Sequence, residues 1–363
     1  MRTTTAVHGA ASDQAQRRRA QAYADEMTVS LALSAQVLAY GALYILPSAA
    51  TAAWWAVLAL LLPWAALRLL GWGIRRTAPP AAVQSAAYRL AAGGMAVLFW
   101  SNMAVCLLSL IELTHVFFFP DGSRLLLSLA AALGLGLGLP ARDAAVSNLA
   151  RPLRIFLIAA FSFCVCTVLP SGEAGYLFPL AGYGVLPTLR CAALGAGGVW
   201  MAGALAVLLP DRQPVPPLRA ALPGALSIVS AALLFLVCAY VLPGTALNFR
   251  PGYALRLQIV MEMSPNTLSW SLMLMAEMLL FLAGFTFCCD LMRRCLHAAL
   301  GVSRLPTLPF ALACVPPAVI GMGTMEPLLI RLLPWRYPAA ALLMLLCLAD
   351  NLIKRRKRAR QNE

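Results

Sequence analysis

The fold of this chain follows from stretches such as residues 268–289, LSWSLMLMAEMLLFLAGFTFCC, where a single glutamate interrupts an otherwise uncharged run. About 20 predominantly apolar residues cross a bilayer core as a helix. Within lipid, a spanning helix satisfies its own backbone hydrogen bonds, so runs of this kind predict membrane-spanning helices. We predict about ten of them, in an all-α integral membrane protein: Val29–Leu46, Ala52–Ile74, Leu90–Phe119, Leu125–Leu139, Ala144–Leu169, Cys191–Leu209, Ala220–Leu242, Leu268–Cys289, Leu308–Met325 and Tyr337–Ile353.

The overall composition agrees with a membrane protein. Hydrophobic residues make up 61% of the chain and charged residues only 12%, against about a quarter charged in an ordinary soluble domain. We therefore expect a polar N-terminal tail at 1–26, one polytopic domain at 27–353 and a basic tail at 354–363, with the lipid bilayer as the main environment.

The net charge of +14 would suggest a nucleic-acid partner in a soluble protein, but topology explains it better. With the N-terminus inside, the inner segments hold 21 Lys and Arg, and the outer loops hold six, among them Arg331 and Arg336. This is the positive-inside asymmetry. It predicts an even number of spans, both termini in the cytoplasm and no nucleic-acid partner. Arg68 falls inside a predicted span, and the sequence assigns it no role.

Cofactor-dependent or catalytic chemistry has no signal in the sequence. The ten cysteines form no CxxC pair, and the three histidines are far apart, which is unlike the spacing of metal ligands. A P-loop and a nucleophile elbow are missing from the sequence as well. We expect a protein that is not an enzyme and that carries no metal or cofactor.

Glycines interrupt two of the predicted spans. Gly41 lies in the first, and Gly195, Gly197 and Gly198 lie in the sixth. These are the opening spans of two five-helix halves, about 27–169 and 187–353. Transporters built from inverted repeats break corresponding helices in this way and bind ligand at the breaks. The alternative is that the glycines serve close helix–helix packing.

Three stretches carry a resemblance to a known family: GALYILPSAATAAWW at 41–55, SNLARPLRIFL at 147–157 and YLFPLAGYGVLPTLRCAALGAGG at 176–198. The first resembles an opening G-x-x-x-x-LP followed by small residues and tryptophan. The other two resemble the runs at the fifth span and leading into the sixth. Together they resemble the spore germination permeases, the B subunit of germinant receptors, in the amino acid–polyamine–organocation transporter superfamily. The chain departs from the family pattern at Ala53 and in VWMAG at 199–203.

The resemblance implies an inverted-repeat (5+5) fold with discontinuous helices 1 and 6. It implies that the protein senses a small nutrient germinant such as an amino acid, with or without transporting it. It also implies A and C receptor subunits as partners and the spore inner membrane as the location. The alternatives are an amino acid or cation symporter of the same superfamily, and a membrane scaffold that transports nothing.

Two sets of residues are the candidates for function. Glu277 lies near the middle of the eighth predicted span, where a charge exposed to lipid is unfavourable by several kcal/mol. We expect it to couple protons or cations, or else to be a protonated carboxyl bonded to a neighbouring helix. For substrate binding we expect two groups of residues to face each other across a central cavity: Gly41, Ala42 and Tyr44 on one side, and Gly195, Gly197, Gly198 and Trp200 on the other.

Overall fold

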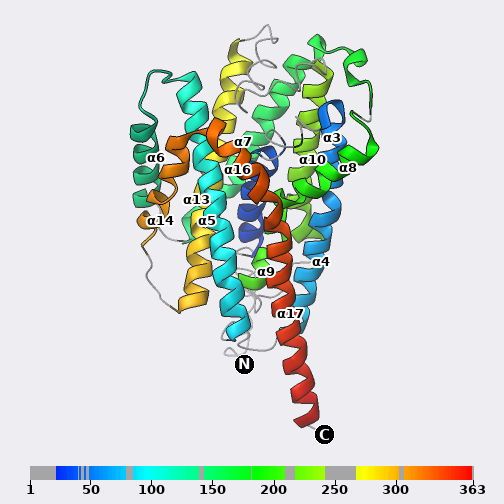
Figure 1. The fold of residues 1–363 in the computed structure, drawn as a ribbon, viewed down its shortest axis with the longest axis vertical. Coiled ribbons are helices and arrows are strands. Elements are labelled where there is room, and N and C mark those ends of the chain that lie inside the picture. The colour runs from blue at the N-terminus through cyan, green and yellow to red at the C-terminus, as the bar shows by residue number, and fades with distance from the viewer. Residues whose placement is uncertain are drawn as a thin grey trace, which may run out of the picture.

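A computed structural model describes residues 22–39, 41, 45, 49–78, 85–138, 143–180, 182–208, 217–241, 267–301 and 306–361. Every regular element in these ranges is a helix (Figure 1). After a first helix at 22–39, the elements are η2 (Ala50–Ala52), α3 (Ala53–Ala59), α4 (Leu61–Thr77), α5 (Ala86–Phe117), α6 (Arg124–Gly138), α7 (Asp143–Val168), η4 (Leu169–Ser171), η5 (Ala174–Leu177), α8 (Val185–Gly195), η6 (Ala196–Gly198), η7 (Trp200–Gly203), α9 (Ala204–Leu208), α10 (Pro217–Val241), α13 (Thr267–Leu300), α14 (Leu308–Leu312), α15 (Val315–Ile320), α16 (Met322–Leu332), η8 (Leu333–Trp335) and α17 (Arg336–Gln361).

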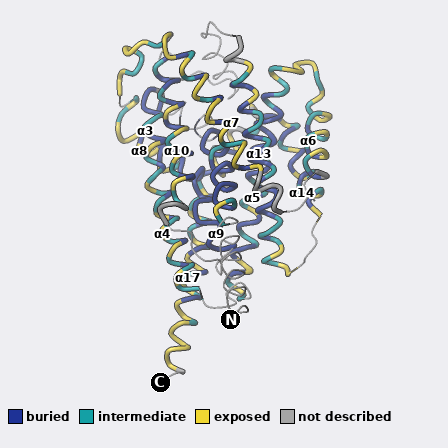
Figure 2. Tube along the Cα trace, turned by 180° about the vertical axis from the view of Figure 1, so that it is seen from behind, coloured by how far each residue is buried: buried dark blue, intermediate teal, exposed yellow. Residues whose placement is uncertain are grey.

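Within the described ranges, six helices are long and apolar enough to cross a bilayer, and a bent pair at 185–208 would make a seventh. Exposed residues lie around the outside of the bundle (Figure 2), and large apolar side chains are among them, as at Leu62, Leu126 and Leu342. A soluble monomer rarely leaves so much apolar surface open to water. These features indicate a multi-pass membrane protein of the all-α class, as predicted.

The positions of the predicted spans agree with helices, although several are short. Helix α6 and the α14–α15 pair are shorter apolar helices, and the first helix is described only over 22–39. The total of ten spans and the inverted repeat therefore stay predictions. The expected break in the first span falls among residues 40–48, most of which lie outside the described residues.

Helices α5 and α13 form the centre of the bundle and make its most extensive pairing among the described elements. Both are buried along most of their length (Figure 2). Ser85 caps α5, its hydroxyl accepting a hydrogen bond from the Tyr88 N–H (3.3 Å), as expected for an N-cap serine. On one flank α6 packs against α14 and α15, and on the other α3 packs against α8 and α10 (Figure 1).

An ion-pair network ties the start of the first helix to α4, through Arg68 in its middle and Arg75 near its end, and to the end of α13. Glu26 pairs with Arg68 (2.7 Å), and Asp25 pairs with Arg294 (3.0 Å). Asp290 pairs with Arg294 (2.7 Å) and with Arg293. Asp25, Glu26 and Asp290 are buried. We refer to these residues as the inner charge network, because the topology prediction places all three helix ends on the cytoplasmic side.

Helix α17 starts deeper in the bundle than the sequence suggests. Pro334 in η8 ends the preceding helix because it cannot continue the backbone hydrogen bonding. Arg336, the first residue of α17, is 6% exposed and contacts residues near the middle of α5. Placing Arg336 in an outer loop was therefore wrong. At its other end α17 continues to Gln361, so the described part of the predicted 354–363 tail is helical and projects beyond the bundle (Figure 1).

Candidate functional site

The sixth predicted span is broken in the structure. Its two halves, Val185–Gly198 and Trp200–Leu208, meet at an angle of 49°. Between them Val199 has φ −109° and ψ 9°, in the bridge region between helix and strand. Three glycines in the sequence GAGG at 195–198 weaken the helix here, at about 1 kcal/mol each relative to alanine. At the break, short-range hydrogen bonds replace the regular helical ones: the Val199 N–H donates to the Ala196 carbonyl (2.9 Å), and the Ala202 N–H donates to the Val199 carbonyl (3.1 Å).

A group of buried polar side chains lies beside this break. The Arg336 guanidinium donates to Gln36 Oε1 (3.0 Å), Asn102 Oδ1 (3.2 Å) and the Ser101 carbonyl (3.0 Å). Asn102 Nδ2 in turn donates to Cys288 Sγ (3.0 Å). We call these five residues the central polar cluster. It joins the first helix, α5, α13 and α17, and the turn just before Arg336 packs on η6.

Two buried donors near this cluster lack a strong acceptor among the described residues: Trp200 Nε1 has no hydrogen-bond partner there, and Gln36 Nε2 has only the thiol of Cys106, a weak acceptor, beside it. Gln36 and Trp200 are fully buried, and the Trp200 ring packs edge-on against Phe99 with centroids 4.8 Å apart. A buried donor without an acceptor is unfavourable by about 1–3 kcal/mol. An acceptor oxygen, such as that of a carboxylate, is the group that either donor could bind.

The predicted ligand residues lie at close contacts in the structure. An added Cβ at Gly195 would be 2.9 Å from Ile45 Cδ1, so the first and sixth predicted spans do meet at this point. At Gly197 it would overlap the Leu333 carbonyl oxygen, and at Gly41 it would overlap the Phe235 ring. Gly198 is buried. Ala42 and Tyr44 lie outside the described residues.

These contacts give Gly41, Gly195 and Gly197 a packing role, which is the alternative that the sequence left open. They neither show nor exclude a ligand at the break, so substrate binding by the seven residues stays a prediction.

Arg68, to which the sequence assigned no role, links the inner charge network to the break. Its Nη1 donates both to Glu26 Oε2 (2.7 Å) and to the carbonyl of Ala202 in η7 (3.2 Å). A 3₁₀ segment between two helices leaves carbonyls that need donors. Arg68 supplies one of these donors. Because the same Nη1 also bonds to Glu26, a movement of the first helix at Glu26 would displace the donor to the Ala202 carbonyl in the broken sixth span.

Glu277 lies in the interior of the bundle, 1% exposed. Its Oε1 has no hydrogen-bond partner among the described residues. The thiols of Cys164 in α7 and Cys238 in α10 are near enough to interact with it electrostatically. The inward orientation expected from the sequence is thus confirmed, and it places the carboxyl where α7, α10 and α13 meet.

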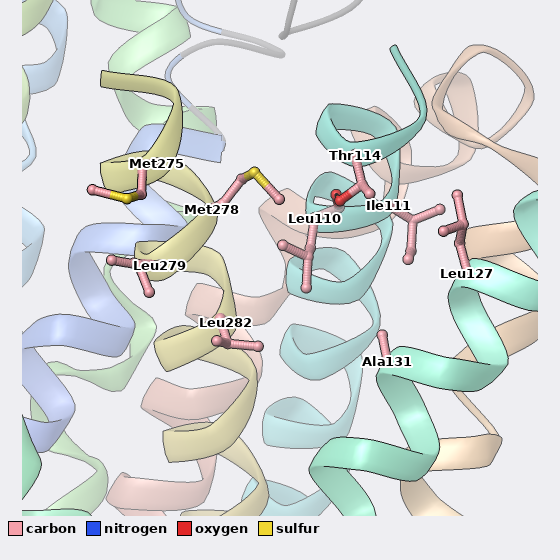
Figure 3. A pocket seen from close by; sticks show the side chains of 9 residues that line it. All are labelled: Leu110, Ile111, Thr114, Leu127, Ala131, Met275, Met278, Leu279 and Leu282. Atoms are coloured by element: carbon pink, nitrogen blue, oxygen red, sulfur yellow. Dashed lines mark hydrogen bonds between the residues drawn. The ribbon is translucent and has the colours of Figure 1, made fainter. Parts of the chain in front are cut away.

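Two cavities in the described part of the chain could be considered for a solute. The first, of about 370 Å³, lies between α5, α6 and α13 (Figure 3). Its wall is apolar apart from Thr114, whose hydroxyl donates to the carbonyl of Leu110 (2.7 Å), so nothing there would orient a polar solute. The second, of about 490 Å³, lies between the first helix, α7 and α10 and includes Arg154. Neither is lined by the predicted ligand residues.

Sequence reasoning missed Gln36, Asn102, Arg336 and Arg154. Gln36 and Asn102 gave a usable signal, because each is an isolated amide within an apolar run, and polar side chains in membrane helices usually face the bundle interior. Arg336 lies between Pro334 and Pro338, in a stretch that resembles a loop, so only the tertiary structure shows that it is buried. Compared with protein-family models and with curated proteins, the chain matches none.

Proposed function

We propose that this chain is a ten-helix membrane protein of the inverted-repeat transporter type, with both termini in the cytoplasm, that binds a small solute bearing a carboxylate at the broken sixth span. The observation that carries the proposal is the 49° break at Val199 beside the buried donors of Gln36 and Trp200. In inverted-repeat transporters, broken helices bind ligand near the midplane, and here the buried side-chain donors would supply hydrogen bonds to it.

An amino acid fits these features better than a larger or purely apolar solute. Its carboxylate would accept from Trp200 Nε1 and Gln36 Nε2 and would lie close to the Arg336 cation, while Phe99 and Trp200 offer an apolar wall. Hydrogen bonds to a charged group contribute about 1.5–3 kcal/mol each. The inner charge network would hold the cytoplasmic end closed, and its link through Arg68 would carry the effect of ligand binding to the first helix.

The biological role comes from the resemblance alone. As in the spore germination permeases, binding of a nutrient germinant would be passed to A and C subunits in the spore inner membrane, with or without transport. Co-purification with such subunits supports the receptor. Uptake by the protein alone in vesicles supports a symporter, and the lack of any ligand-induced thermal shift supports a scaffold.

Variants at the break test ligand binding. We expect some amino acids in a panel to raise the unfolding temperature of the purified protein, and Gly198→Leu to abolish that shift because it adds bulk where backbone must approach the ligand. Trp200→Phe keeps the ring but removes Nε1, and should weaken binding about tenfold.

Gly134→Leu is the matched control, since residue 134 lies on an exposed face of α6 with nothing within 4 Å of an added Cβ. If Gly134→Leu and Gly198→Leu bind the same amino acids equally well, the ligand does not bind at the break.

The second candidate function is symport, and it rests on Glu277. Since Glu277 is buried with Oε1 unpartnered among the described residues, Glu277→Gln should keep folding and ligand binding but remove the dependence of uptake or response on pH or on a cation. The measurement is uptake into proteoliposomes at a series of external pH values.

A wild-type pH profile in the Gln variant ends the coupling hypothesis. If Glu277→Leu then lowers the unfolding free energy by about 1–3 kcal/mol, Glu277 is instead a structural carboxyl bonded to a neighbouring helix.

A further inference from the structure

A long groove runs down the outside of the bundle between the first helix, α7 and α10. It has a volume of about 490 Å³ and extends along α7 from Arg154 to Leu169. At 1.5 Å per residue, that stretch of helix is about 22 Å long, which is more than the depth of one leaflet, about half of the roughly 30 Å hydrocarbon core. The groove is open along one side, where Ile158, Leu169 and Leu233 are 49%, 42% and 56% exposed.

One end of the groove carries a cation. Arg154 Nη1 donates to Ser30 Oγ (3.2 Å) and to Met27 Sδ (3.0 Å), and Nη2 donates to the carbonyl of Pro223 (3.0 Å). All three acceptors are neutral, and no carboxylate pairs with Arg154 among the described residues. These bonds fix the guanidinium in place at the mouth of an apolar groove with its charge not neutralised.

The rest of the groove has no comparable polar group. Its wall holds four serines: the hydroxyls of Ser34 and Ser227 donate to the backbone carbonyls of Ser30 and Pro223 (both 3.0 Å), and Ser162 and Ser230 add two further neutral hydroxyls. Hydroxyls bonded to the backbone in this way leave the wall nearly apolar. The remaining lining is mostly leucine, isoleucine, valine and phenylalanine. The groove is therefore long, apolar and open to the side, with a single cation at one end.

We propose that this groove binds an anionic phospholipid of the surrounding bilayer, with one acyl chain along α7 and α10 and the headgroup phosphate on Arg154. This assignment rests on two features: the positive charge of Arg154 and the opening of the groove along one side. Basic pockets between transmembrane helices on the cytoplasmic side recognise anionic headgroups, and an unpaired cation facing lipid is unfavourable. This site is separate from the break in the sixth span, and the proposal does not depend on which solute binds there.

Native mass spectrometry of the detergent-purified protein titrated with phosphatidylglycerol tests the proposal. We expect one phosphatidylglycerol to be retained, with phosphatidylcholine bound at least fivefold more weakly, about the effect of one surface charge. Arg154→Gln should weaken phosphatidylglycerol binding about tenfold, the loss of one charge-assisted hydrogen bond. The matched control is Arg151→Gln, which removes an exposed arginine one turn earlier on α7 that does not line the groove.

A second variant leaves Arg154 and its hydrogen bonds intact. Ser230 is exposed and lines the groove, so Ser230→Phe should fill the path of the acyl chain and also weaken phosphatidylglycerol binding. Glycerol 3-phosphate should not compete at the same concentration, because it has no chain. Equal binding by phosphatidylcholine, full competition by glycerol 3-phosphate, or loss of affinity in Arg151→Gln equal to that in Arg154→Gln would each overturn the proposal.

Discussion

Replacing Arg336 by methionine is expected to lower the free energy of unfolding by roughly 2–4 kcal/mol. Arg336 donates to three acceptors on two other helices: the buried Gln36 Oε1 and Asn102 Oδ1, and the partly buried Ser101 carbonyl. Methionine fills similar volume but donates no hydrogen bond, so each acceptor loses its partner in an environment without water. Unfolding of the purified protein in mixed micelles measures the change.

Arg331→Met is the control, because Arg331 is exposed and lies five residues earlier, where substitutions usually change stability by less than about 0.5 kcal/mol. Arg336→Lys should fall between the two, since an ammonium cannot reproduce the fork of donors. A triple variant, Arg336→Met with Gln36→Leu and Asn102→Leu, should recover much of the loss because it removes acceptors together with their donor. Equal stability of Arg336→Met and Arg331→Met would show that the central polar cluster does not hold the helices together.

Gly197→Ala is expected to destabilise the protein by roughly 3 kcal/mol, at the upper end of the range for overpacking. The added methyl would overlap the Leu333 carbonyl oxygen and lie 2.8 Å from its carbonyl carbon and 3.1 Å from Pro334 Cα. These are backbone atoms, so no side-chain rotation can relieve the contact. We expect the broken sixth span to separate from η8. Thermal unfolding measures the loss of stability, and quenching of the fluorescence of Trp200 reports the separation.

Gly134→Ala provides a control with the opposite sign. Residue 134 is exposed within α6 and has nothing within 4 Å of an added Cβ, so alanine should stabilise the helix by about 0.5–1 kcal/mol. If Gly197→Ala were as stable as the wild type, the sixth span would not pack on η8 as described.

The sequence by itself determined the class of this protein. In lipid, a long apolar run such as 268–289 satisfies its backbone N–H and C=O groups by forming a helix. The glycines at 195–198 located the break in the sixth span, because helix propensity is a local property. Glu277 was also placed correctly inside the bundle, because a carboxyl in the middle of an apolar run would be energetically unfavourable if it faced lipid.

Only the tertiary structure decided which polar groups meet. Gln36, Asn102 and Arg336 come from three distant parts of the chain, and a pattern along one helix carries no information about its partners across the bundle. Arg336 was misplaced for that reason: a bend at Pro334 brings it into the interior, whereas its local sequence is that of a loop. Likewise, the groove at Arg154 exists only because the first helix, α7 and α10 leave space between them, a property of helix packing that no single segment determines.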